Sequence, residues 1–194
     1  MFNDLSSPLA LLATRRSGKP RDMVAPGPDE AQLAAILGIA ARTPDHGKLA
    51  PWRFVTVAAG QRDALARLLV SAYRAGRPEA GRLEIEAAEQ FARQAPALVV
   101  ALFSPKESHI PLWEQELSCG AACMNLLHAA HAHGFVGGWL TGWAAYNDRV
   151  RDAFGAAPER IAGFLFLGSP SRALDERPRP AADSVVSAWE APDS

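Results

Sequence analysis

The apolar run Ala97–Phe103 constrains the fold of this chain more than any other segment. Pro96 and Pro105 bound the run, and its length is that of a strand rather than of a complete helix. A strand without polar interruptions is typical of one that is buried on both faces of a sheet. We therefore expect Ala97–Phe103 to be a strand that other elements cover on both sides.

Helical and strand patterns alternate over the rest of the chain. We expect helices over Pro8–Thr14, Gln61–Arg74, Glu79–Arg93, 112–133 and Asn147–Phe154, and another that Asp29 caps and Thr43-Pro44 ends. Further strands are expected over Arg53–Val57, Phe135–Leu140 and Ile161–Leu167. With no repeat and no linker, this mixture predicts a single α+β domain over residues 1–194. Residues 171–194 are expected to form an extended tail that wraps a neighbour or trails into solvent.

The helix expected over 112–133 has a middle made almost entirely of small residues, Cys119-Gly120-Ala121-Ala122-Cys123. Small side chains let another helix approach closely, which favours the centre of the fold or a dimer interface. An ordinary buried helix explains the same residues equally well. Cysteines four apart on a helix have poor geometry for a disulfide, so we expect both to be reduced and buried.

Charge and composition exclude several classes of function. Apolar residues make up 48% of the chain, charged residues 21%, and the net charge is -1. No bulk positive field therefore favours binding to nucleic acid or to an anionic membrane. No apolar run approaches the ~20 residues of a membrane span, and no secretory signal is visible at the N-terminus. A cytoplasmic location is the expectation that follows.

Several catalytic motifs are missing from the sequence. There is no phosphate-binding P-loop, no Rossmann glycine pattern between a strand and a helix, and no nucleophile elbow around a serine. His128, His131 and His133 lie close together in sequence, but no carboxylate or thiolate stands at ligand spacing. We predict no metal site, and we assign no side chain as a catalytic nucleophile or base.

Two basic segments are candidates for binding an anion. The first, Arg15-Arg16-Ser17-Gly18-Lys19-Pro20, follows the first helix, and a phosphate could satisfy one of its guanidinium groups in a bidentate way. A solvated basic turn is the plainer interpretation. The second segment, Arg42–Phe54, joins a helix to a strand and gathers potential cations beside Trp52. Its plainer interpretation is a turn shaped by Pro44 and Pro51, with Trp52 filling the core.

Taken together, these segments resemble the nitroreductase family, and more narrowly its YdjA-like branch. The resemblance rests on motifs that occur in order over residues 8–170. They are Arg15-Arg16-Ser17, Arg42-Thr43-Pro44-Asp45-His46 followed by Pro51-Trp52, Trp113-Glu114-Gln115-Glu116, Gly137-Gly138-Trp139, and Gly163-Phe164-Leu165-Phe166-Leu167-Gly168-Ser169-Pro170.

The resemblance implies an α+β, nitroreductase-like fold, with a mixed β-sheet flanked by helices, and an intertwined homodimer with FMN at the subunit interface. It implies that one subunit binds FMN through Arg15, Arg16 and Ser17, and that Arg42 and His46 reach the same FMN from the partner. Trp139, Leu140 and Thr141 would complete the FMN pocket. Contacts to NAD(P)H are implied, less firmly, for the end of the long helix, namely Ala129, Ala130, His131, Ala132, His133 and Gly134.

The activity implied by the resemblance is that of an FMN-dependent NAD(P)H oxidoreductase that reduces nitroaromatic or quinone-like acceptors by a ping-pong mechanism. Such chemistry belongs to the flavin, so no catalytic side chain is required. One departure from the branch is Leu140, which stands where an arginine is usual; Lys48, Arg177 or Arg179 could compensate. The alternatives are a family member with another redox role and a non-enzymatic flavin-binding dimer. A DNA-binding module has little support.

Overall fold

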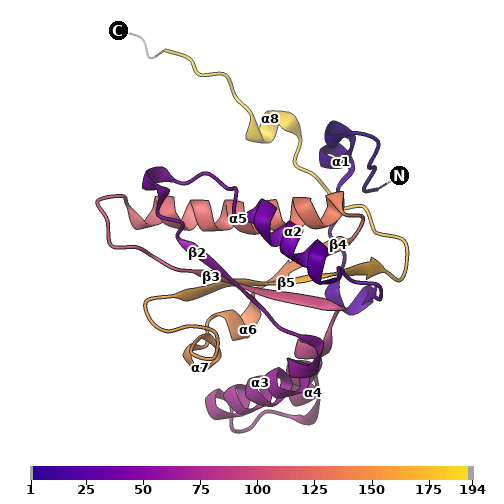
Figure 1. Cartoon of the computed structure of the whole chain (residues 1–194), viewed down its shortest axis with the longest axis vertical. Coiled ribbons are helices and arrows are strands. Elements are labelled where there is room, and N and C mark those ends of the chain that lie inside the picture. The colour runs from indigo at the N-terminus through magenta and orange to yellow at the C-terminus, as the bar shows by residue number, and fades with distance from the viewer. Residues whose placement is uncertain (1, 192–194) are drawn as a thin grey trace.

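The structure, a computed structural model, describes residues 2–191 (Figure 1). Its sheet contains β1 (Met23–Val24), β2 (Trp52–Thr56), β3 (Ala97–Phe103), β4 (Val136–Leu140) and β5 (Arg160–Pro170). The order is β1-β5-β3-β2, and β4 also pairs with β5. The pairings among the described residues are all antiparallel, so the parallel pairing that a mixed sheet would include is not among them.

The described residues form the following helices: α1 (Pro8–Thr14), α2 (Glu30–Ala40), α3 (Arg62–Gly76), α4 (Arg82–Arg93), α5 (Leu112–Ala132), α6 (Gly142–Ala145), α7 (Asp148–Arg151) and α8 (Ala182–Val185). The expected α+β class and the helices on the sheet are confirmed. The short elements β1, α6 and α8 were not predicted. No helix among residues 2–191 is both long and apolar enough to span a membrane.

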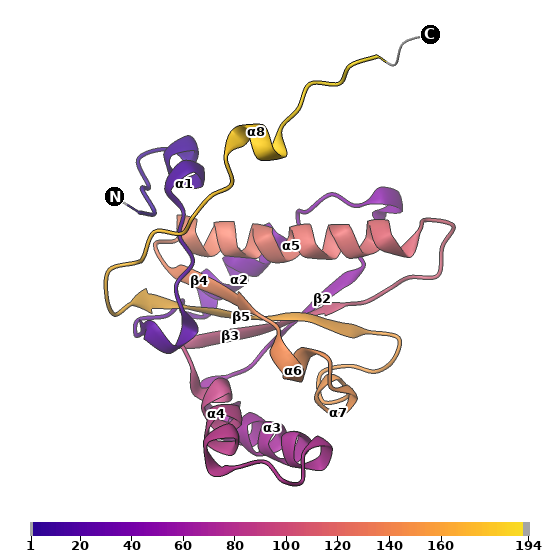
Figure 2. The same cartoon turned by 180° about the vertical axis from the view of Figure 1, so that it is seen from behind.

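The sheet lies between two layers of helices (Figures 1 and 2). Strand β3 is buried along its whole length, as its sequence predicts. Its side chains alternate between two cores: Val100 and Leu102 pack with α3 and α4, whereas Val99 and Ala101 pack with α2 and α5. Strand β5 divides in the same way, with Phe164 and Phe166 on one side and Leu165 and Leu167 on the other. Each face of the sheet therefore has its own apolar core.

Local caps fix where several helices begin. The Asp29 side chain accepts a hydrogen bond from the backbone N–H of Gln32, which confirms it as the N-cap of α2. Helix α4 begins at Arg82, later than the expected Glu79, because the Glu84 carboxylate accepts a hydrogen bond from the N–H of Gly81, the N-cap residue. Asn147 caps α7, but that helix ends at Arg151 rather than at the expected Phe154.

The small residues in the middle of α5 lie partly against the sheet and partly at the surface. Cys119, Ala122 and Cys123 are buried against the sheet, whereas Ala121 is exposed. Both cysteines are free, as expected. The pKa of Cys123 is raised, first because its thiol is hydrogen-bonded to Cys119 and then because it is buried, so it is held as a neutral thiol.

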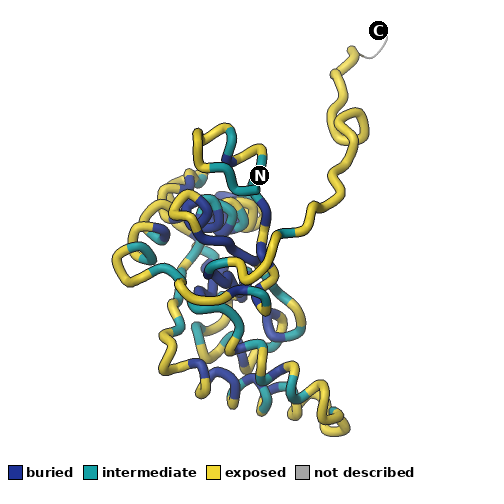
Figure 3. The backbone as a smooth tube through the Cα atoms, turned by 90° about the vertical axis from the view of Figure 1, so that its right-hand side faces the viewer, coloured by how far each residue is buried: buried dark blue, intermediate teal, exposed yellow. Residues whose placement is uncertain are grey.

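The C-terminal tail leaves the body of the protein after β5 (Figure 3). Its first part lies against the body, where Leu174 packs on the core that includes Met23, Val136 and Phe166. Its later part is exposed and includes the large apolar side chains Val185, Val186 and Trp189. Among the described residues of the tail, the short helix α8 is the regular element.

Candidate functional site

The loop Arg15–Pro20 crosses from α1 to the edge of the sheet and is held by its backbone. The N–H of Arg16 donates to the side-chain oxygen of Asn3 at 2.8 Å. The N–H of Gly18 donates to the carbonyl of Gly137 in β4 at 3.1 Å. On the other side, the ring of His131 at the end of α5 contacts the carbonyl oxygen of Arg16. These contacts fix the loop in place, so the positions from which its side chains project are set by the fold.

This loop and the first part of the tail enclose a cavity of about 640 Å³, here called the arginine cavity. Its volume falls within the range of small-molecule sites. It is lined by Arg15, Arg16, Ser17, Gly18, Lys19, Pro20, Asp22, Met124, Leu127, Gly138, Trp139, Leu140, Arg172, Ala173, Leu174, Asp175, Glu176, Arg177 and Arg179. Of the expected FMN residues, it brings together Arg15, Arg16, Ser17, Trp139 and Leu140.

The charges in the arginine cavity are crowded. The pKa of Arg15 is lowered, mainly because the side chain is partly buried and further because the positive charges of Arg179 and Arg16 lie near it. The pKa of Arg16 is lowered by burial and then by Arg179. Arginine stays protonated in proteins, so these side chains remain cations that are partly removed from water and also repel one another. An anion in the cavity would relieve that repulsion.

Arg16 is the most buried cation of this group. Its side chain is 9% exposed, and its guanidinium lies 4.9 Å from the centroid of the Phe2 ring. One of its terminal nitrogens donates to the carbonyl of Arg15, but its Nε has no hydrogen-bond partner among the described residues. A buried N–H without a partner is costly, which marks a place where a ligand oxygen would be stabilising.

The tail supplies carboxylates to the same loop. Glu176 forms an ion pair with Arg16, and Asp175 lies 3.4 Å from Lys19. Next to them, Arg172 pairs with Asp22 at 2.7 Å. The arginine cavity is therefore closed on one side by a segment of the chain that lies far from the loop in sequence.

Strand β4 forms another wall, and its glycines permit the packing. A Cβ on Gly138 would lie 2.8 Å from the carbonyl oxygen of Gly18 and 3.1 Å from the Pro20 ring, closer than such atoms pack. Trp139 follows, and its Nε1 donates to the carbonyl of Ala162 at 3.0 Å. Gly163 leaves room for that indole, because a Cβ there would overlap it. The orientation of Trp139 is thus set by a hydrogen bond and by a glycine.

A second cavity of about 410 Å³, here called the aromatic cavity, lies on the other side of Trp139. It is lined by Phe103, Glu116, Cys119, Gly120, Trp139, Ala145, Tyr146, Asn147, Asp148, Arg151, Arg160, Ile161 and Ala162. Arg160 pairs with Glu116 and lies over the Phe103 ring, 5.0 Å from its centroid. Trp139 lines both cavities, so it is their shared wall.

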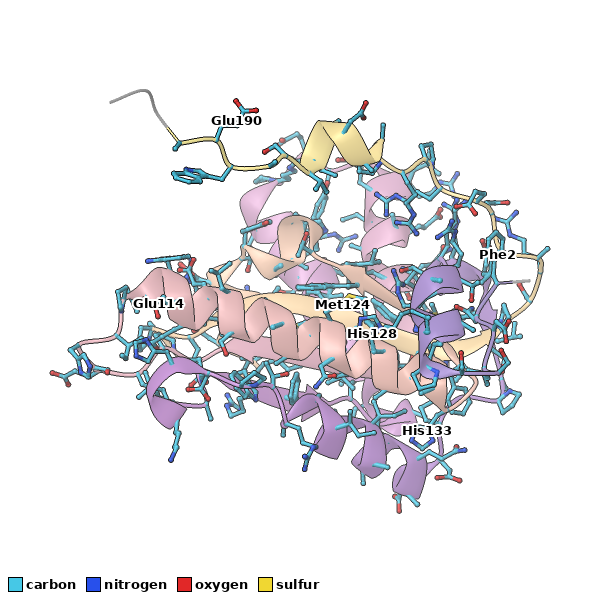
Figure 4. All side chains as sticks on the ribbon, turned by 90° about the horizontal axis from the view of Figure 1, so that it is seen from above. Phe2, Glu114, Met124, His128, His133 and Glu190 are labelled. Atoms are coloured by element: carbon cyan, nitrogen blue, oxygen red, sulfur yellow. The ribbon has the colours of Figure 1, made fainter. Side chains whose placement is uncertain are left out.

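Arg42 and His46 do not line either cavity within this chain. The Nδ1 atom of His46 lies 2.8 Å from a carboxylate oxygen of Glu114, in the first turn of α5. His131, which contacts the arginine loop, lies in the last turn, roughly 25 Å farther along the helix at 1.5 Å per residue. Figure 4 shows Glu114 and His133 near opposite ends of α5. Only a second subunit could bring His46 to the arginine cavity.

The six residues expected to contact NAD(P)H differ in how far they are buried. Ala129, Ala130 and His131 are buried, whereas Ala132, His133 and Gly134 are exposed where α5 ends. None of these six residues lines the arginine cavity, and neither does Thr141, which precedes α6. If NAD(P)H contacts this end of α5, the exposed residues are the ones that can touch it directly.

Sequence reasoning missed most of the wall that the tail contributes. It named Arg177 and Arg179 only as possible substitutes for an arginine at position 140, and it gave no role to Asp175 and Glu176. The aromatic cavity was also missed. The sequence feature that pointed to this cavity was the Trp113–Glu116 motif, because its last residue, Glu116, lines the cavity and pairs with Arg160.

Comparisons with known proteins place the chain in a family. Residues 12–169 match the Nitroreductase family. The chain is 36% identical over 165 residues to the "Putative NAD(P)H nitroreductase YdjA" of Escherichia coli strain K12, covering 84% of this chain and 87% of that protein. It is also 36% identical over 164 residues to the "Putative NAD(P)H nitroreductase" of Haemophilus influenzae, covering 83% and 87% of the two chains.

Solved structures share the fold at low sequence identity. A nitroreductase-like family protein from Bacillus cereus superposes with a TM-score of 0.78 at 21% identity, over 96% of this chain and 97% of that chain. The FMN-dependent nitroreductase NfnB from Mycobacterium smegmatis, solved in complex with NADPH, gives a TM-score of 0.76 at 18% identity, over 96% and 100% of the two chains.

Proposed function

The chain belongs to the nitroreductase family, and we propose that it is an FMN-dependent oxidoreductase that takes electrons from NAD(P)H. The observation that carries this proposal is the buried guanidinium of Arg16. Its Nε has no hydrogen-bond partner among the described residues, and it lines a cavity rich in cations beside Trp139. FMN is the cofactor of several proteins that share this fold, including NfnB.

The residues present fit the phosphate of FMN. A phosphate dianion offers several acceptor oxygens, and arginine binds such groups in a bidentate way. Arg15, Arg16 and Ser17 would hold it from the loop. Arg177 and Arg179 line the same cavity and compensate for the neutral side chain of Leu140. Lys48 is not a substitute within the chain, because it follows His46 at the other end of α5.

The aromatic cavity fits a flat ring next to that phosphate. Trp139 lines both cavities, and Gly120 of α5 lines the aromatic cavity without a side chain that would fill it. Bound flavin would supply the capacity to accept and pass on a hydride. The side chains of this chain would position the ring, exclude water and stabilise negative charge with an arginine. NAD(P)H and the acceptor would use the same slot in turn, which is a ping-pong order, with nitroaromatic or quinone-like compounds as acceptors.

We assign the complete site to a homodimer. Neither Arg42 nor His46 lines the arginine cavity of its own chain, and His46 lies at the other end of α5, so we assign both to the site of the partner. The exposed face of α5 offers an apolar surface for that partner, through Trp113 and Leu117, which are 62% and 61% exposed. Leu9 and Leu12 on α1 are also exposed, at 78% and 58%. A cytoplasmic location stays a prediction from the sequence.

The first experiment is the absorbance spectrum of the purified protein, followed by anaerobic addition of NADH or NADPH. Flavin bands that bleach on addition would support the proposal, and a colourless protein that takes up no added FMN would contradict it. The Arg16→Ala variant should lose affinity for FMN but much less for riboflavin, which lacks the phosphate. Arg74→Ala, an exposed arginine on α3, is the matched control and should bind both as the wild type does.

A further inference from the structure

We propose that Glu176 of the C-terminal tail is a built-in occupant of the phosphate site, which a phosphate group must displace in order to bind. The proposal rests on the proposed function, since FMN is the ligand that would displace it. It assigns to the tail a role in controlling how readily the protein takes up its cofactor. The observations that carry it are the ion pair of Glu176, the burial of Arg16 and the anchors of the tail just before Glu176.

The ion pair between Glu176 and Arg16 places a carboxylate on the guanidinium that is best suited to a phosphate. Anchors hold the tail at that point. Upstream, the N–H and hydroxyl of Ser171 donate to the carbonyl of Asp22 at 2.9 and 2.8 Å, and Arg172 pairs with the Asp22 side chain. Leu174 packs on the core. The position of Glu176 is therefore set by neighbouring contacts and is not that of a free chain end.

Arg16 is buried and Glu176 is exposed, and this difference makes Glu176 the replaceable member of the pair. The Arg16 side chain is 9% exposed, so an anionic partner stabilises its charge strongly. The Glu176 side chain is 61% exposed and can return to water at little cost. The carboxylate also leaves the Arg16 Nε without a partner among the described residues. A phosphate brings more charge and a further oxygen, so it can satisfy that nitrogen as well.

Competition of this kind lowers the apparent affinity for FMN, because only the fraction of molecules in which the Glu176 carboxylate has left Arg16 can bind the phosphate. Removing the carboxylate while keeping the side-chain shape should reverse the effect. For Glu176→Gln we expect the Kd of FMN to fall roughly 3- to 10-fold. The Kd of riboflavin should stay the same, since riboflavin has no phosphate to compete with Glu176.

The matched control is Glu190→Gln, which removes the same charge from an exposed position of the same tail beyond the arginine cavity. Flavin fluorescence titration of the three proteins gives the Kd values. A gain in FMN affinity that is specific to Glu176→Gln supports the proposal. An equal gain in Glu190→Gln would assign the effect to overall charge, and no gain in either variant would also overturn the proposal.

Displacement should also be visible in the wild-type protein without any assay of activity. A protease that cuts after glutamate should cleave the bond after Glu176 faster once its ion pair with Arg16 is broken, and Glu190, which is exposed and makes no such pair among the described residues, is the reference site. We expect FMN, and inorganic phosphate at higher concentration, to accelerate cleavage at Glu176 relative to Glu190. Riboflavin should not. Protection of Glu176 by FMN would show instead that the tail closes over the bound cofactor.

Failure of this inference can be told apart from failure of the proposed function. If the wild type binds FMN and Glu176→Gln binds it no more tightly, the proposed function stands and Glu176 is not an occupant of the site. If neither protein binds FMN, both proposals fail.

Discussion

The Nε2 atom of His131 lies 2.9 Å from the carbonyl oxygen of Arg16, so a buried ring at the end of α5 holds the loop of the arginine cavity. The other ring nitrogen, Nδ1, lies 2.6 Å from the carbonyl oxygen of Leu127. A neutral imidazole has a single N–H and can donate to only one of these oxygens. The protonation of His131 therefore bears on the position of Arg16.

We predict that the stability of the protein falls as the pH drops below about 6.5, the ordinary pKa of histidine. The pKa of folded His131 is lowered, chiefly by burial, although its contacts with the Leu127 and Arg16 carbonyls oppose that effect. The unfolded chain then binds more protons than the folded chain between the two pKa values, so stability rises with pH across this window. Urea unfolding at a series of pH values measures it.

Replacement of the ring should remove part of this pH dependence. His131→Ala is expected to lose about 2–3 kcal/mol at neutral pH, because a buried hydrogen bond and its packing disappear. Its stability should vary less with pH, with a remainder from His128, whose pKa is also lowered by burial. His133→Ala, at an exposed position, is the control. An unchanged pH dependence in His131→Ala would contradict this assignment.

Gly138→Ala should weaken FMN binding although it adds only a methyl group. The added Cβ would press on the Gly18 carbonyl and the Pro20 ring, so the loop carrying Arg15 and Arg16 must move away from β4. We expect about 1–3 kcal/mol of destabilisation, typical of overpacking, together with a Kd for FMN raised at least ~10-fold. Denaturant unfolding and fluorescence titration measure the two effects.

Gly60→Ala serves as the control for this substitution, since a Cβ at that position meets no atom within 4 Å. It should leave both quantities close to their wild-type values. If Gly138→Ala bound FMN as well as Gly60→Ala does, the close packing of β4 on the loop would not matter for the cofactor.

The sequence predicted best those features that depend on neighbouring residues. The ends of α1 and β3 match the expected Pro8–Thr14 and Ala97–Phe103, because prolines and an unbroken apolar pattern mark them locally. The start of α4 was misplaced, since Glu79 is a plausible helix residue and the cap at Gly81 depends on a side-chain bond. The loop Arg15–Pro20 was identified through a motif of neighbouring residues.

Features that join distant segments could not be predicted in this way. Nothing local to Glu176 indicates that it will meet Arg16, because the contact depends on where β5 ends and on the anchors at Asp22. The aromatic cavity likewise forms where β4, β5, α5 and α7 meet. The contributions expected of Arg42 and His46 lie between subunits and stay predictions.

Leu140→Arg is predicted to tighten FMN binding. Leu140 lines the arginine cavity next to Trp139 and is only partly buried, so a longer side chain has access to the cavity. An added guanidinium would supply one more phosphate contact, for which we expect a gain of roughly 3- to 10-fold in affinity for FMN and none for riboflavin. The same gain for both flavins would show that position 140 contacts the ring and not the phosphate.

Gly120→Leu should separate the folding of the chain from its association. Within the chain a Cβ on Gly120 meets no atom within 4 Å, and leucine favours a helix over glycine by up to about 1 kcal/mol, so the fold should not be destabilised. A partner helix packed on this face of α5 would, however, meet the new side chain. We therefore expect monomers by light scattering. FMN binding should also be weak, both because the leucine fills part of the aromatic cavity that Gly120 lines and because Arg42 and His46 of a partner are missing. Gly38→Leu, which changes an equally open position on α2, should remain dimeric, and a dimeric Gly120→Leu would place the interface elsewhere.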